Sequence, residues 1–475
     1  MPINVLPDDA LLEIFEFYMH QLVTRWKKDG WITLVHVCQK WRDIVFRSPR
    51  RLNLQLVCTA RTPVARTLAV WPPLPIVIEQ LSDSTRDGDN VLAAVEHSDR
   101  ICKITFWDTS SAQEKFLAAM QEPFPALTYL DLRSSDGTPS VIPNPILGGS
   151  APHLRVLTLD SLSIRGLPKL LSSATDLVVL NLYNIPHSAY ISPETLATCL
   201  STPKRLRFFD LGFESPLSRP HREHRRLPPT AHTVLPALSS FVFKGASEYL
   251  EDFVTRIDAP SLHCLDITFF HQLIFDTPQL THFVSRLPAL NVRNQAQARV
   301  VFSGGKVSVV FLRPPCGVFG MRISCRQSEW QLSSLAQLCT SSFPQALIPT
   351  VEDLYLVDNR DFQPHWLDDI DNSQWLEILR PFKALKNLYL STELAPCVAP
   401  SLQELGEQVA DSLPALQGLF LQELHPLGPI EDSIKEFVAA QRLLNRPIAI
   451  SHWERDYPSW SFGPPEVYRW PVLFD

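Results

Sequence analysis

A six-residue pattern, apolar-x-x-apolar-x-apolar, recurs ten times along this sequence, and adjacent copies lie mostly 23 to 34 residues apart. The alternation within each copy predicts a strand with one buried face. Stretches of helical periodicity stand between copies, at 247–257, 278–287, 330–338, 375–379 and 402–413. A strand and a helix in each unit can bury their apolar sides only against neighbouring units. The copies begin at Ile101 (the weakest), Leu127, Leu154, Leu177, Leu206, Leu238, Leu262, Val351, Leu385 and Leu416.

The placement of proline supports this division into units. The chain has 41 prolines and only 16 glycines in 475 residues, which is high for proline and low for glycine. A proline two residues before a copy would end the preceding helix, and its missing N–H costs little at the start of a strand. Six copies have this proline: Pro125, Pro152, Pro236, Pro260, Pro349 and Pro414.

The segment 295–326 interrupts the pattern. Two β-rich stretches, 299–302 and 307–312, flank the sequence Ser-Gly-Gly-Lys at 303–306, which predicts a hairpin. Another strand is expected at 319–325. The Ser-Gly-Gly-Lys sequence lacks the spacing and the following helix of a phosphate-binding loop. We therefore expect the sheet to continue here with altered or inserted units.

The repeating strand and helix resemble irregular leucine-rich repeats. The resemblance implies an α/β solenoid over 51–450, curved like a horseshoe, and an aromatic-rich segment, 451–475, that caps its last layer. The repeats are irregular because only Asn359 matches the asparagine expected three residues after the last apolar position. A doubly wound α/β fold is the alternative, since it also alternates strands and helices. That fold needs no fixed repeat unit and usually has a glycine-rich turn after its first strand.

Residues 1–50 have a helical pattern instead. Asp8 is a good N-cap and Asp9 complements the positive end of a helix that continues with apolar residues at helical spacing. Asp29-Gly30 predicts a turn, and a second helical pattern then runs from Trp31 to Val45 before Pro49. These short helices bury little surface alone, so they should lean on the next domain, on a partner, or on both.

This N-terminal segment resembles an F-box. The resemblance rests on Leu-Pro at 6–7, on Leu-Leu-x-Ile-Phe at 11–15, and most specifically on Val-Cys-x-x-Trp-Arg at 37–42. In that family the helices dock on the Skp-type linker subunit of cullin–RING ubiquitin ligases. An apolar patch with a tryptophan anchor suits helix-in-groove binding. The resemblance implies that the following residues form or support the dock: Leu6, Pro7, Leu11, Ile14, Phe15, Val37, Cys38 and Trp41.

The two resemblances together imply a substrate-recognition subunit of an SCF-type ubiquitin ligase that binds an unknown protein substrate with its repeats. In such an array, the residue between the last two apolar positions of each unit points onto the concave face. These residues are Thr105, Asp131, Thr158, Asn181, Asp210, Val242 and Asp266, followed by Tyr355, Tyr389 and Phe420. We expect a groove that takes a basic segment at the acidic positions (Asp131, Asp210, Asp266) and an apolar anchor at the aromatic ones. Binding by inserted loops is the alternative.

Patterns for catalysis or metal binding do not emerge from the sequence. His221, His224 and His232 lie in or beside a proline-flanked basic run, but no cysteine or carboxylate pair completes a metal site, so a solvated loop is expected. The acidic residues at 368–371 lack the ligand ladder of a calcium loop and fit a helix start. The chain lacks Gly-x-Ser-x-Gly and His-Glu-x-x-His. We expect no enzymatic activity and no cofactor.

Composition bounds the partners and the compartment. The net charge of −7 gives no footprint for nucleic acid. The nine cysteines show no disulfide or Cys-x-x-Cys framework, which fits a reducing compartment. Neither a signal peptide nor a long apolar run is present, so we expect no membrane partner and an intracellular protein, cytoplasmic or nuclear. A protein-interaction scaffold without ligase partnership and, more weakly, an α/β enzyme are the alternative functions.

Overall fold

The computed structural model describes residues 6–23, 30–61, 64–81, 89–135, 140–142, 146–164, 166–218, 232–271, 275–290, 296–303, 305–313, 317–325, 330–342, 347–358, 372–405, 413–422 and 428–454. The chain packs as two compact units. Unit 1 comprises residues 1–270 and 277–289, and unit 2 comprises residues 271–276 and 290–475. The predicted boundaries at residues 50 and 450 stay predictions.

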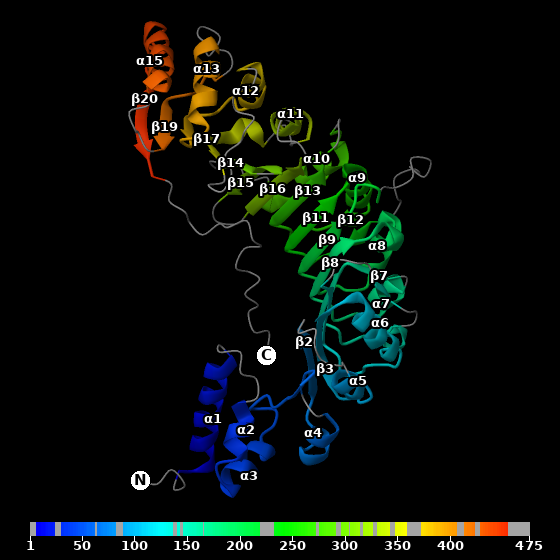
Figure 1. Cartoon of the computed structure of the whole chain (residues 1–475). Coiled ribbons are helices and arrows are strands. Elements are labelled where there is room, and N and C mark those ends of the chain that lie inside the picture. Colours follow the sequence, from blue (N-terminus) through cyan, green and yellow to red (C-terminus); the bar gives the residue numbers. More distant parts are fainter. Residues whose placement is uncertain are drawn as a thin grey trace. The chain divides into compact units, whose positions relative to one another are not determined.

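Unit 1 begins with three helices, α1 (Asp8–Val23), α2 (Gly30–Val35) and α3 (Gln39–Arg47), so the second predicted helical pattern is divided into two helices. Asp8 and Asp9 lie in the first turn of α1, where they complement the helix dipole. The helices share one apolar core with the chain that follows, since Leu52, Leu54 and Leu56 are buried with them. The helical segment is therefore packed against the start of the sheet (Figure 1).

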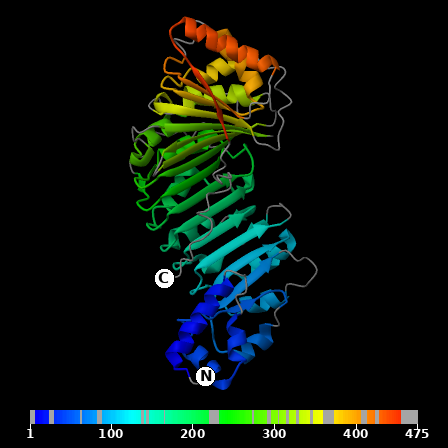
Figure 2. The same ribbon diagram turned by 90° about the vertical axis from the view of Figure 1, so that its left-hand side faces the viewer.

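The rest of unit 1 is a parallel sheet whose strands follow chain order: β1 (Leu56–Cys58), β2 (Ile76–Leu81), β3 (Ile101–Asp108), β4 (Tyr129–Ser134), β6 (Val156–Asp160), β8 (Val179–Ile185), β9 (Phe208–Phe213), β11 (Ser240–Gly245) and β13 (Cys264–Phe270). Figure 2 shows these strands side by side. Among the described strands of unit 1 this order never reverses, unlike that of a doubly wound fold. Short parallel pairs lie in the connections: β5 (Ser140–Ile142) with β7 (Leu162–Ile164), and β10 (Thr233–Val234) with β12 (Ile257–Asp258).

Helices connect the strands of unit 1 and lie along one side of the sheet (Figure 1). They are α4 (Val64–Val70), α5 (Asp89–Val95), α6 (Ser110–Ala119), α7 (Leu167–Ser173), α8 (Pro193–Cys199), α9 (Ser247–Val254) and α10 (Pro278–Ser285). The repeated apolar residues fill the layer between strands and helices; Leu127, Leu130 and Leu132 are all fully buried, and their counterparts in later units are also buried. The predicted strand in each copy is thus confirmed.

Unit 2 is a mixed sheet in the order β16 (Gly317–Ser324), β15 (Lys306–Arg313), β14 (Ala296–Ser303), β17 (Val351–Asp358), β18 (Asn387–Leu390), β19 (Gly418–Gln422) and β20 (Ala449–Trp453). The predicted hairpin is confirmed, because β14 and β15 pair antiparallel with Ser303 opposite Lys306. From β14 onward, the pairs to β17, β18, β19 and β20 are parallel. The helices α11 (Trp330–Gln337), α12 (Asn372–Leu379), α13 (Ala395–Leu405) and α15 (Gly428–Leu443) accompany these strands.

Candidate functional site

The eight residues expected to form or support a linker dock fall into two groups. Leu11 and Phe15 are fully buried, so they belong to the core of the helical segment. Leu6 and Trp41 pack half-buried against that core, with the rings of Phe15 and Trp41 4.7 Å apart. Cys38 is also half-buried. The outward group comprises Pro7, Ile14 and Val37, all of which are exposed.

An exposed residue that sequence reasoning missed extends the outward group. Phe17 is 66% exposed, and it follows Ile14 by three residues on α1. Pro7, Ala10, Ile14 and Phe17 therefore form a stripe at spacings that share one face of the helix. Val37, 53% exposed, lies just after α2. We call these five residues the outer apolar stripe. The exposure of Phe17 could have been predicted from the sequence. Phe15 and Phe17 are about 200° apart around a helix, so they cannot both face the same core.

Polar contacts fix the helices beneath the outer apolar stripe. Lys40 of α3 pairs with Asp8 at 3.4 Å and donates to the carbonyl of Leu6 at 2.8 Å. Trp31 of α2 donates its indole N–H to the carbonyl of Gln55 at 2.9 Å. Because these bonds hold the start of α1 to α3 and α2 to the chain before β1, the stripe is presented on a fixed support.

In unit 1, the residues predicted to face a groove are aligned across the strands. Successive pairs place Thr105 beside Asp131, then Thr158, Asn181, Asp210, Val242 and Asp266. The row is less accessible than expected: Asp131 is 5% exposed, and Thr158 and Asn181 are 1% and 3% exposed. Asn181 donates to the Thr158 hydroxyl at 3.1 Å. Neighbouring side chains of the sheet thus satisfy much of this polar row.

Two acidic residues of the row, Asp131 and Asp210, offer less free negative charge to a cation than the sequence predicts. Asp131 accepts two hydrogen bonds from the guanidinium of Arg133, at 2.8 and 3.0 Å, so its charge is already paired. Burial raises the pKa of Asp210 to about 7, with Asp266 adding to the rise while the Tyr183 hydroxyl and Lys244 oppose it. Asp210 is therefore only partly ionised near neutral pH, which weakens the expected acidic character.

An apolar row lies beside the polar one and was not anticipated. Val156 and Val179 form a small buried cluster against which Tyr129 and Phe208 pack, and these four residues are successive partners across β4, β6, β8 and β9. Lys103 places its ammonium 4.2 Å from the centre of the Tyr129 ring. The sheet face of unit 1 therefore offers apolar as well as polar contacts.

In unit 2, the three predicted aromatic residues stack as a column across neighbouring strands. The rings of Tyr355 and Tyr389 are 4.1 Å apart, and those of Tyr389 and Phe420 are 4.4 Å apart, with interplanar angles of 12° and 16°. Trp453 stands nearly perpendicular to both tyrosines, at 5.9 and 5.8 Å. Its indole N–H donates to the carbonyl of Leu390 at 3.1 Å. We call the rings of Tyr355, Tyr389 and Phe420 the aromatic column.

The aromatic column is uncharged at neutral pH. Burial is the main cause that raises the pKa values of Tyr355 and Tyr389, and the carboxylate of Asp353 raises both further. Asp353 is itself held by the side-chain amides of Asn387 and Gln297, at 2.8 and 3.4 Å. The column is therefore suited to stacking and apolar contact rather than to acid–base chemistry.

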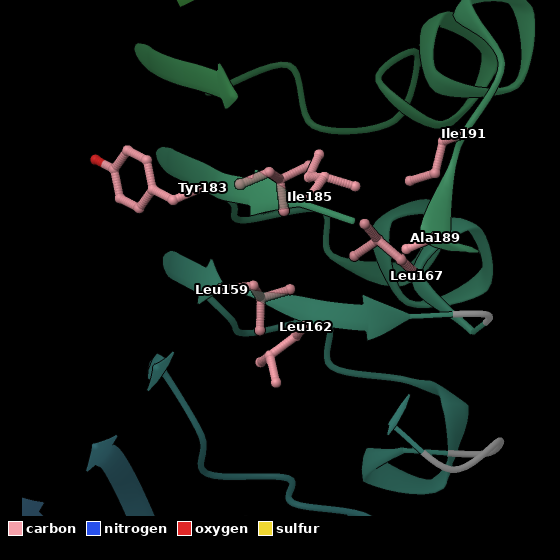
Figure 3. A pocket seen from close by; sticks show the side chains of 8 residues that line it. Leu159, Leu162, Leu167, Tyr183, Ile185, Ala189 and Ile191 are labelled. Atoms are coloured by element: carbon pink, nitrogen blue, oxygen red, sulfur yellow. The ribbon is translucent and has the colours of Figure 1, made fainter. Parts of the chain in front are cut away.

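A small pocket in unit 1 is lined mainly by aliphatic side chains. It is lined by Leu159, Leu162, Leu167, Leu182, Tyr183, Ile185, Ala189 and Ile191 (Figure 3). Figure 3 shows the ring of Tyr183 extending away from the other labelled side chains, so the lining toward α7 is aliphatic. Among the described residues, no group of three or more histidine, cysteine, aspartate or glutamate side chains could hold a metal ion. None of the described helices is both long and apolar enough to cross a membrane.

Several sequence features lie outside the described residues: the basic run with His221 and His224, the acidic residues at 368–371, Asn359, Gly304 and the tail from 455 onward. His232 is described and is exposed. The roles predicted for the features outside the described residues stay predictions.

Comparison with known proteins finds similarity among solved structures alone. No protein-family model matches the chain, and no curated protein matches it. Among solved structures, the chain is similar to the leucine-rich repeat-containing protein LegL7 from Legionella pneumophila, with 13% identity over 81% of this chain and 97% of that one, at a TM-score of 0.28.

Proposed function

We propose that this protein is a substrate receptor of an SCF-type ubiquitin ligase, built as an F-box and an irregular leucine-rich-repeat solenoid. The N-terminal helices would bind the Skp-type linker, and the sheet faces would bind a protein to be ubiquitinated. The chain would supply recognition, and other subunits would supply the chemistry, so the protein would not itself be an enzyme.

The observation that carries this proposal is the outer apolar stripe. A short helical segment with a filled core does not need further apolar side chains on its surface, yet Phe17 is 66% and Ile14 43% exposed on one face of α1. Apolar residues spaced three and four apart on a helix are how helices dock into apolar grooves. The stripe also contains three of the residues that the F-box resemblance assigns to docking, Pro7, Ile14 and Val37.

The substrate side of the proposal rests on the two sheet faces. Each unit presents a row of aligned side chains, polar and apolar in unit 1 and aromatic in unit 2, and aromatic residues commonly contribute most to interface affinity. A plain interaction scaffold would use the same faces without the N-terminal dock. Binding to the Skp-type linker therefore distinguishes a ligase receptor from a plain interaction scaffold.

The test is a binding assay between the full chain and a purified Skp-type linker. The variant Ile14→Asp/Phe17→Asp places charge on the stripe without touching the core and should abolish binding. Val70→Asp is the matched control, because Val70 is also 66% exposed but lies on α4. Wild type and the control should bind equally. If the folded wild type fails to bind the linker, the ligase-receptor function is excluded and the interaction scaffold is the function that remains.

A further inference from the structure

The strand β20 is the outermost strand of the sheet in unit 2, and its outer edge is open. It pairs with β19 on one side, and none of the described strands pairs with it on the other (Figure 1). All residues from Ala449 to His452 are exposed. In unit 1, by contrast, the edge strand β1 contributes Leu56 to the buried core of the N-terminal helices. One edge strand is therefore covered by other parts of the chain, and β20 is not.

The backbone of β20 has hydrogen-bonding groups that point outward. The N–H of Ala449 donates to the carbonyl of Gln417, just before β19, at 2.8 Å. Because N–H groups alternate in direction along a strand, those of Ile450 and His452 point away from β19. Open edges are usually blunted by lysine, proline or a bulge. The described strand β20 contains neither lysine nor proline, and its register with β19 is unbroken, so its edge is suited to pair with another strand.

The apolar layer beside β20 is open as well. Leu419 of β19 is fully buried between the sheet and the helices, but its neighbour Ile450 on β20 is 41% exposed. Leu443 and Leu444, at and just after the end of α15, are 88% and 42% exposed. A lone extended segment would pair with the backbone of β20 and leave the leucines uncovered. A strand that brings its own helix would cover both.

We infer that this end of unit 2 binds a second copy of the same chain, with the two β20 strands antiparallel about a two-fold axis at Ser451. Ile450 of each copy then faces His452 of the other, so the outward backbone groups of both residues bond in pairs. Ser451 faces its own counterpart, and the small Ala449 faces the large Trp453. In this register no two like-charged residues of β20 face each other, which would be unfavourable. This dimer goes beyond the proposed function and does not depend on the linker dock.

The first test is sedimentation of the full chain over a range of concentrations. The contact is small, so we expect a weak dimer whose population grows up to about 100 µM. Ile450→Asp places a charge at the strand edge, and Leu443→Asp/Leu444→Asp places charges at the end of the helix. Each should raise the dissociation constant about tenfold or more, because a charge would be buried without a partner. Val234→Asp is the matched control, since Val234 is 43% exposed on β10 of unit 1, and it should dimerise as wild type.

The second test is a cysteine cross-link that reports the register. The two-fold axis places Ser451 opposite itself, in a non-hydrogen-bonded pair whose Cα atoms lie about 4.5 Å apart, within reach of a disulfide. Ser451→Cys should therefore give a covalent dimer under mild oxidation. Ala449→Cys is the control on the same face of the strand, because its counterpart lies about 14 Å away. It should cross-link no more than wild type.

A chain that stays monomeric at every concentration would overturn the inference. So would a dimer that is unchanged in both Ile450→Asp and Leu443→Asp/Leu444→Asp, since it would form through another surface. Absence of the Ser451→Cys product, or equal cross-linking of Ala449→Cys, would overturn the two-fold pairing. Ile14→Asp/Phe17→Asp should dimerise as wild type, and Ile450→Asp should bind the linker as wild type, so failure of the dimer and failure of the linker dock are distinguishable.

Discussion

Replacing Phe15 by alanine should open the N-terminal helices, whereas the same change at Phe17 should leave them closed. The two phenylalanines lie two residues apart on α1, but Phe15 is fully buried and Phe17 is 66% exposed. Truncating a fully buried phenylalanine costs about 3–5 kcal/mol, because apolar contact is lost and a cavity remains. An exposed truncation changes stability by about 0.5 kcal/mol or less.

Amide hydrogen exchange of α1 and α3 measures this difference locally, which matters because a chain of two units need not unfold in one step. Every 1.4 kcal/mol is about tenfold in an equilibrium, so Phe15→Ala should accelerate exchange about a hundredfold or more. Phe17→Ala should change it about twofold at most. Similar acceleration in both variants would refute the division between core and outer apolar stripe.

Three further predictions concern unit 1 and unit 2. Gly418→Ala should displace the Phe420 ring and destabilise unit 2 by about 1–3 kcal/mol, seen as altered near-ultraviolet circular dichroism. Asp210→Asn should raise the melting temperature more at pH 8 than at pH 5. The reason is that burial lifts the pKa of Asp210 from 3.8 to about 7, so the stability it contributes when protonated is lost as pH rises through that range. Glu251→Ala should cost about 1–3 kcal/mol and speed exchange in α10, because the Glu251 carboxylate accepts two N–H bonds from the start of that helix.

The strands of the repeats could be predicted because each is encoded locally. The apolar positions of a copy alternate in the period of a strand, and the structure buries them, with Leu157, Leu180 and Leu265 all fully buried. The hairpin at 296–313 followed from the same local signals around its glycine turn. The register of the predicted row across the strands also followed, since equivalent positions of equivalent units pair.

Other strands escaped prediction because their sequences lack that unit. β2 begins with the continuous buried run Ile76, Val77 and Ile78, and neither it nor the three-residue β1 has the repeated spacing. The sheet therefore begins earlier than the first copy at Ile101. β20 is largely exposed, and an exposed strand carries little apolar pattern to read. Its existence depends on pairing with β19, which is a tertiary effect.

The candidate sites could be predicted only in outline. Sequence reasoning correctly aligned the aromatic residues of unit 2, but the charge of Asp131 is paired by Arg133, which shares its face of the strand. The pKa of Asp210 depends on packing from three other strands and could not be read from its neighbours in sequence. The exposure of Phe17 was missed because Phe17 falls outside the helical spacing of Leu11, Ile14, Phe15 and Tyr18 and so received no role.

The most direct test of the central claim is hydrogen exchange of the full chain with and without a Skp-type linker. The account predicts new protection in α1 and around Val37, with the outer apolar stripe at its centre, and little change in the sheets of either unit. A linker that binds elsewhere, or that leaves exchange in α1 unchanged at saturating concentration, would contradict the proposal that these helices form the dock.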